Sequence, residues 1–265
     1  MSEQQEVIAD LAAAGVLAGV RWAYLSAATR ALETYSEADG DDPALLGSSR
    51  FTRFRDRLDR VFACERYAVH ADDDDADLDL LYDQLSERDI STMPRLDPDL
   101  VRRSNLSGSP GWAHGGRRFL LASCEFGRLD RIPWPQKSKT KQRVARQSNP
   151  EPSQPSLFED FADEEVGGLA ALTAGGELDL VTYVVAHTLD PLSRHIELAL
   201  GRPRLNAGGG QPWHWRQNLL DMPPADGGRR SGDASLPAGS DTVPDAPVRL
   251  RRRQAEHRGD ASGDR

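Results

Sequence analysis

The sequence has little cysteine and no apolar run of membrane-spanning length. Its 265 residues include two cysteines, Cys64 and Cys124, too few for a disulfide framework or a cysteine-rich zinc site. The most apolar early stretch runs from Leu11 to Val20, whereas a membrane-spanning helix needs about 20 residues. Glu3 and Glu6 precede it, where a secretory signal would carry positive charge. We therefore expect a cytoplasmic protein.

Apolar side chains are scarce as well. Hydrophobic residues make up 38% of the chain and aromatic residues 6%, whereas folded domains usually contain about 45–50% apolar residues. The 23 glycines and 17 prolines add many breaks in regular structure, so we expect part of the chain to be unfolded. The net charge of −9 argues against a dominant nucleic-acid surface and leaves room only for local basic stretches.

Residues 1–134 have the pattern of a helical N-terminal region that contains one central strand. Apolar residues recur at helical spacing between Trp22 and Leu32, which predicts a helix. Gly15 and Gly19 lie just before this segment, where they predict either a break or close helix packing.

Further elements follow in the same region. Residues 51–62 place apolar side chains on one helical face and charged side chains on the other, and residues 78–85 repeat the apolar spacing. The aspartates at 72–75 precede this third helix, where negative charge stabilises a helix N-terminus. The apolar run 119–124 predicts a buried strand.

The second half of the chain divides by composition. Residues 135–156 form a basic Pro/Ser linker without an apolar period, so we expect no packed core to include it. Residues 157–222 form a small α+β region, in which 178–189 is a strand rich in β-formers. Ile196, Leu198 and Leu200 alternate with polar or small residues, which predicts a half-buried return strand and a β-hairpin. Residues 223–265 have the composition of a disordered basic tail. The fold class expected is therefore α+β.

One short motif points to a partner. The segment Gln154-Pro155-Ser156-Leu157-Phe158 resembles the pentapeptide by which bacterial proteins bind the sliding clamp, usually Gln-Leu-Ser/Asp-Leu-Phe. The resemblance covers five residues and departs at Pro155, where leucine is commoner. It implies that Leu157 and Phe158 fill an apolar pocket while Gln154 and Ser156 make polar and backbone contacts.

A structural interpretation of the same residues stays open. Ser156 followed by Glu159 has the spacing of a helix capping box. Leu157 and Phe158 would then begin the first helix of the region that follows and would belong to its core.

A basic stretch precedes the motif. It consists of Lys137, Lys139, Lys141, Arg143 and Arg146. Such a stretch can neutralise several phosphates without reading sequence; the alternative is a solvated linker.

Histidines supply the enzymatic alternative. His187, Asp190 and His195 are close in sequence, and a hairpin could bring some of them together, with His214 further along. Converging imidazole and carboxylate groups could support acid–base or metal chemistry, although strand alternation places His195 on an exposed face. Trp213 and Trp215 flank His214 and either stack on a base or fill a core.

The sequence thus favours a non-enzymatic, DNA-associated accessory protein that docks on a bacterial sliding clamp. We expect no cofactor and no metal site. The alternatives are a phosphate-handling hydrolase or nuclease that uses the histidines, and a regulatory protein–protein adaptor without nucleic acid.

Overall fold

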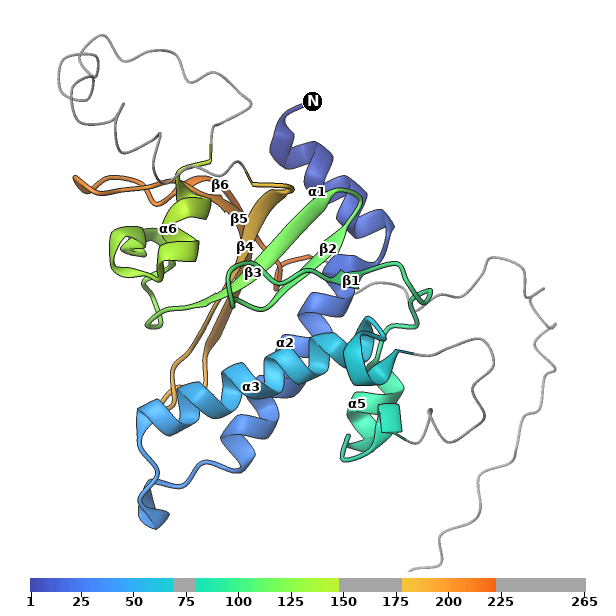
Figure 1. Ribbon diagram of the computed structural model, residues 1–265. Helices are drawn as coiled ribbons and strands as arrows, with labels where there is room; N and C mark the ends of the chain where they lie inside the picture. The colour runs from blue at the N-terminus through green and yellow to red at the C-terminus, as the bar shows by residue number, and fades with distance from the viewer. Residues whose placement is uncertain (69–79, 148–177, 223–265) are drawn as a thin grey trace, which may run out of the picture. The chain divides into compact units, whose positions relative to one another are not determined.

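The computed structural model describes residues 1–68, 80–147 and 178–222 and confirms an α+β fold (Figure 1). N-terminal helices pack on a six-stranded mixed sheet of order β1-β2-β3-β4-β5-β6. The expectations for the aspartate run at 72–75, for the clamp motif and for the tail at 223–265 lie outside the described residues.

The predicted break near Gly15 is confirmed. Helix α1 (Glu3–Ala13) ends there and α2 (Val16–Glu33) begins, with Gly15 at φ 77°, a conformation that glycine adopts at little cost. Close packing is confirmed at Gly19, where an added Cβ would lie 2.8 Å from the ring of Phe62. Among the described helices none is alone long and apolar enough to cross a membrane, and the pair α1 and α2, which together satisfy that test, is bent by 76°.

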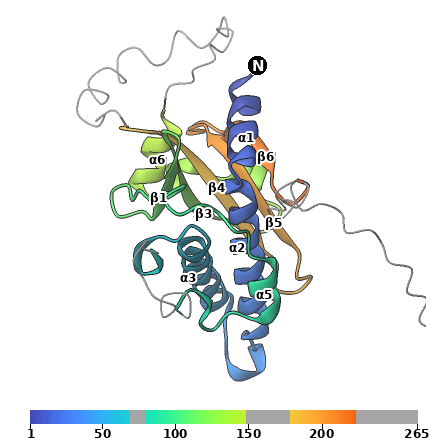
Figure 2. The same ribbon diagram turned by 90° about the vertical axis from the view of Figure 1, so that its right-hand side faces the viewer.

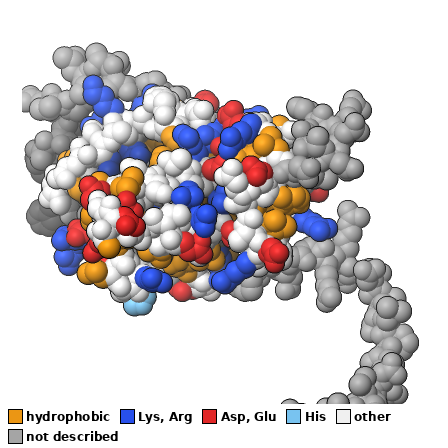
Figure 3. Space-filling view, turned by 90° about the horizontal axis from the view of Figure 1, so that it is seen from below, with side chains coloured by type: hydrophobic (Ala, Val, Ile, Leu, Met, Phe, Trp, Pro, Cys, Tyr) orange, Lys and Arg blue, Asp and Glu red, His pale blue; other side chains and the backbone are white. Residues whose placement is uncertain are grey.

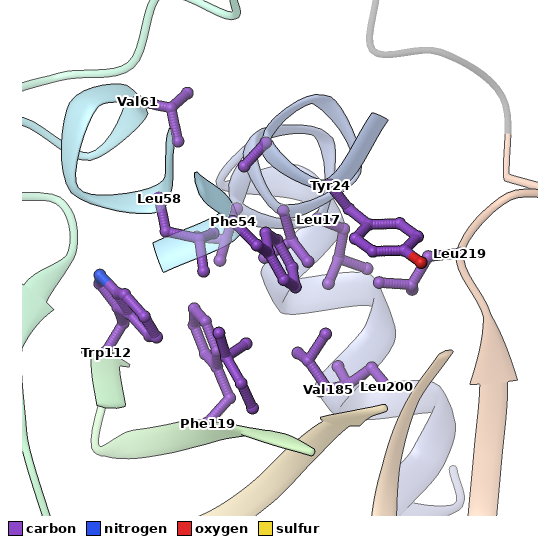
Figure 4. Close-up of a cluster of buried hydrophobic side chains, with 14 of the residues drawn as sticks. Leu17, Tyr24, Phe54, Leu58, Val61, Trp112, Phe119, Val185, Leu200 and Leu219 are labelled. Carbon is purple, nitrogen blue, oxygen red and sulfur yellow. The ribbon is translucent and has the colours of Figure 1, made fainter. Parts of the chain in front are cut away.

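Helix α3 (Pro43–Val61) completes the helical layer. The carboxylate of Asp42 caps it by accepting a 2.7 Å hydrogen bond from the backbone N–H of Leu45. Helices α2 and α3 lie along the same face of the sheet (Figures 1 and 2). Figure 4 shows their side chains meeting those of the strands in the larger hydrophobic core, where buried residues include Tyr24, Phe54, Leu58, Trp112, Phe119, Val185 and Leu200.

One strand pair in the sheet is parallel. β3 runs beside β4 with Arg117 opposite Val181 and Ser123 opposite His187, while the other neighbours are antiparallel. Strands that the sequence placed in regions 1–134 and 157–222 therefore belong to one sheet. The strands are β1 (Arg102–Arg103), β2 (Gly111–His114), β3 (Arg117–Ser123), β4 (Val181–Leu189), β5 (Ile196–Pro203) and β6 (Trp213–Asn218).

The predicted hairpin is confirmed, but the prediction that its return strand is buried on one face only is wrong. β4 and β5 pair antiparallel, with Leu189 opposite Ile196. Leu198 and Leu200 pack in the helix-covered core, as expected, whereas Ala199 is equally buried on the opposite face. The reason is a second apolar layer, so β5 is covered on both sides.

That second layer contains part of the predicted linker. Helix α6 (Lys139–Ala145) buries Val144 and Ala145 against Trp134 and the sheet. The expectation that no packed core includes residues 135–156 is therefore wrong for residues 139–145. Trp213 is also buried in this layer, with its ring 5.1 Å from that of Trp134, which confirms its core-filling interpretation.

The charged face of α3 is partly buried in ion pairs. Asp56 accepts hydrogen bonds from Arg57, Arg60 and Arg66 at 2.7–2.9 Å. Asp59 binds Arg103 at 2.8 Å. Burial raises the pKa of Asp59 to about 6, against the opposing effect of Arg103. On the face seen in Figure 3, basic and acidic side chains are likewise interspersed.

Glu3 joins the first helix to three strands. Its carboxylate accepts hydrogen bonds from the hydroxyl of Tyr183 on β4 at 3.0 Å and from the indole N–H of Trp215 on β6 at 2.8 Å. It also forms an ion pair with Arg202 on β5, whose side chain is 5% exposed. Loss of Glu3 would leave the Arg202 guanidinium buried without this partner.

We expect Glu3→Ala to lower the free energy of unfolding by roughly 3–5 kcal/mol, because removing one member of a buried ion pair takes away attraction that offsets the desolvation of the other. Glu6→Ala is the matched control, since Glu6 lies on the same helix with its side chain 66% exposed in a pair with Arg117; surface pairs contribute about 0–1 kcal/mol. Urea unfolding of both variants measures the difference. Equal losses would contradict the role assigned to Glu3.

Candidate nucleic-acid interface

The basic residues predicted to contact phosphates lie on and around α6. Ser138 caps this helix by accepting a hydrogen bond from the backbone N–H of Lys141 at 3.5 Å. Lys139 and Arg146 are exposed, and Lys137, which donates to the carbonyl of Ser123 at 2.9 Å, is partly exposed. Partial burial, together with nearby Lys137, lowers the pKa of Lys141.

No acidic side chain neutralises this helix within the described part of the chain. None of Lys137, Lys139, Lys141, Arg143 and Arg146 forms an ion pair there. Arginine and lysine side chains are the groups that most often contact phosphates in nucleic-acid complexes.

The rest of the fold holds α6 in place. Its buried face carries Val144 and Ala145, and the carbonyl of Ala145 accepts a 2.8 Å hydrogen bond from the N–H of Leu205. Gln147, just after the helix, bonds both backbone groups of Thr182 on β4 at 2.7–2.9 Å. These contacts present the basic side chains on a fixed support.

Arg204 is a basic residue whose place near the end of α6 the sequence did not predict. It is exposed and immediately precedes Leu205, which bonds the end of α6. Its proximity results from a tertiary hydrogen bond across the sheet, and no local sequence pattern signals it.

The structure places His187 in the core. Its side chain is 0% exposed and lies among aromatic rings, with centroids 5.2 Å from Phe54 and 5.4 Å from Tyr24. Neither ring nitrogen has a hydrogen-bond partner among the described residues. Burial, and then the positive charge of Arg50, lowers the pKa of His187 well below its usual value.

The other three candidates lie elsewhere. Asp190 caps the hairpin turn, accepting from the backbone N–H of Leu192 at 3.2 Å, and its own N–H donates to the carbonyl of His195 at 2.9 Å. The exposed His195 ring lies 6.2 Å from that of Phe126. His214 is on β6, and burial, followed by Arg202 and Arg204, lowers its pKa. The structure thus joins Asp190 and His195 through the backbone but does not gather the four side chains around one point.

The two cysteine thiols and the other potential metal ligands also form no reactive site in the described residues. Burial raises the pKa of the Cys64 thiol to about 12 and that of Cys124 to about 11, which keeps both thiols protonated and weakly nucleophilic at neutral pH. Across residues 1–68, 80–147 and 178–222, no cluster of three His, Cys, Asp or Glu residues could hold a metal ion.

The clamp-like motif lies outside the described residues, so the structure gives no account of Gln154, Ser156, Leu157 and Phe158. Comparison with protein-family models, with curated proteins and with solved structures gave no match to this chain.

The buried neutral His187 makes stability dependent on pH. Its folded pKa lies below the unfolded value of 6.5, so its contribution is complete above pH 6.5 and is lost as the pH falls below that value. The slope reaches about 1.4 kcal/mol per pH unit. We expect the free energy of unfolding to fall more steeply between pH 6.5 and 5 for wild type than for His187→Phe. Urea unfolding at each pH measures this difference.

His195→Phe is the control for this experiment. His195 is exposed, so its replacement should leave the pH profile of wild type unchanged. Parallel profiles for wild type and His187→Phe would contradict the assignment of this pH dependence to the buried imidazole.

Proposed function

We propose that this protein is a non-enzymatic, DNA-associated accessory protein that docks on a bacterial sliding clamp through Gln154–Phe158. The observation that carries the proposal is a helix whose basic side chains have no acidic partner in the described residues, followed closely in the chain by the clamp-like pentapeptide. A clamp encircles DNA, so a clamp ligand with an adjoining phosphate-binding surface contacts both at once. Two joined contacts strengthen each other by raising the local concentration of the second.

The state of the candidate catalytic groups supports a non-enzymatic role. A general base needs access to the proton that it abstracts, and His187 is enclosed by Tyr24, Phe51 and Phe54. Asp190 is engaged in its own turn with Ser193.

The clamp contact is tested by Leu157→Ala/Phe158→Ala. Each apolar side chain fully buried in a partner pocket contributes about 1.5–3 kcal/mol, so the double variant should bind purified bacterial sliding clamp roughly a hundredfold more weakly or worse. Isothermal titration calorimetry measures the affinity, and thermal melts check that the fold is intact.

Phe161→Ala/Leu169→Ala is the matched control, because it removes the same side-chain types just outside the motif. It should bind like wild type. A wild type that does not bind at tens of micromolar clamp would overturn the proposal. A large fall in melting temperature for Leu157→Ala/Phe158→Ala would instead assign both residues to the core.

The DNA contact is tested by Lys139→Gln/Arg146→Gln, which removes two exposed charges from the α6 surface. Each phosphate contact contributes about 0.9 to the slope of log K against log salt for duplex DNA, so the slope should become shallower by roughly 1.8. Fluorescence anisotropy with a labelled duplex at several salt concentrations gives this slope. Arg55→Gln/Arg95→Gln removes equal charge from exposed positions elsewhere and should leave the slope unchanged; an equal effect of both variants would refute a localised interface.

A further inference from the structure

A groove lies beside helix α2. It runs between α2 and the segment 84–94, which contains the short helix α5 (Glu87–Thr92), and encloses about 1110 Å³. The indole N–H of Trp22 donates to the carbonyl of Asp89 at 3.0 Å and joins the two sides. This volume is in the range of small-molecule sites.

A buried arginine lies in the wall of the groove. Arg57 lines it, with 5% of the residue exposed, and shares the carboxylate of Asp56 with Arg60 and Arg66, which are not lining residues. Among the described residues one carboxylate is thus divided among three guanidinium groups. Burial lowers the pKa of Arg57, and Asp56 opposes that effect. A further anion at this wall would therefore be stabilised.

Two further arginines, Arg21 and Arg88, line the groove. Neither forms an ion pair with a described residue. The acidic lining residues are Glu33, which pairs with Arg30 at 3.1 Å, and Asp89, whose charge acts on Arg57. The lining as a whole carries four arginines and two acids.

The uncharged part of the lining is half apolar and half polar, and its apolar members are Ala18, Trp22, Leu25, Leu85 and Pro94. Leu25 is 37% exposed, and Trp22 and Leu85 lie in the same groove. Because the indole N–H of Trp22 is already bonded, its ring offers a ligand only apolar contact. An occupant would therefore meet arginine at one part of the groove and hydrocarbon at another.

We propose that this groove binds an amphipathic anion, with a carboxylate or phosphate head near Arg57, Arg21 and Arg88 and an apolar body against Leu25, Trp22 and Leu85. Because the lining has more arginines than acidic residues, it favours a negatively charged head. Because Leu25 is exposed, the groove favours a ligand with a hydrocarbon body over a bare inorganic anion. The site is independent of α6 and of the clamp motif.

Three probes separate these requirements on the full chain. Decanoate has both the anionic head and the apolar body, acetate has the head alone, and decyltrimethylammonium has the same tail with a positive charge. Isothermal titration calorimetry should show decanoate binding at least roughly tenfold more tightly than either of the others. If acetate or the cation binds as well as decanoate, the proposal is overturned.

Two surface variants locate the binding. Arg21→Gln/Arg88→Gln and Leu25→Gln change groove residues that are not fully buried, and each should weaken decanoate binding by about tenfold. Arg55→Gln/Arg131→Gln and Leu45→Gln make the same changes at positions outside the lining and should bind like wild type. Thermal melts verify folding of each variant. Unchanged affinity in both groove variants, or equal losses in the controls, would overturn the assignment.

Discussion

The parallel pairing of β3 with β4 is the constraint on which the rest of this fold depends. Parallel strands cannot be joined by a tight turn and need a long crossover connection, and here the pairing unites residues 117–123 with 181–187. Sheets containing such pairs are usually covered on both faces. Helices α2 and α3 cover one face, and α6 with Trp134 and Trp213 covers the other. The support of the basic surface on α6 is thus a consequence of strand topology.

Buried arginine is the second organising feature. Arg57, Arg60 and Arg118 are each at most 6% exposed, and each pairs with a carboxylate that is itself more accessible. The first two pairs lie within α3, and the third joins β3 to Asp179 just before β4; desolvation opposes the Coulomb attraction within each pair. In the wall of the groove beside α2, Arg57 shares the carboxylate of Asp56 with two other guanidinium groups.

The sequence predicted those elements whose formation depends on neighbouring residues in the chain. Gly15 and the apolar run of β4 signal a helix break and a strand without reference to anything distant in the chain. Helix α6 could not be predicted in this way, because its seven residues contain only Val144 and Ala145 as apolar anchors, too few to define a period.

Some strand and site residues could not be predicted because their positions also depend on contacts with distant parts of the chain. β2 begins at Gly111 and spans four residues, and it is a strand because β3 lies beside it. The position of His187 within the helical core and the approach of Arg204 to α6 depend on the same long-range pairing. The candidate basic residues could be identified from the sequence, whereas their fixed support could not.

The bonds of Glu3 also determine when the protein can finish folding during synthesis. Glu3 leaves the ribosome long before Tyr183, Arg202 and Trp215, the residues that its carboxylate bonds, and the last of these lies 212 positions later. The apolar residues Val7 and Leu11 of the same helix are buried in the finished core. Throughout most of translation they lack the strands that will cover them, and exposed apolar surface on incomplete chains is what chaperones bind and what aggregates. A nascent chain of this protein therefore carries an unburied first helix until almost all of its sheet has been made.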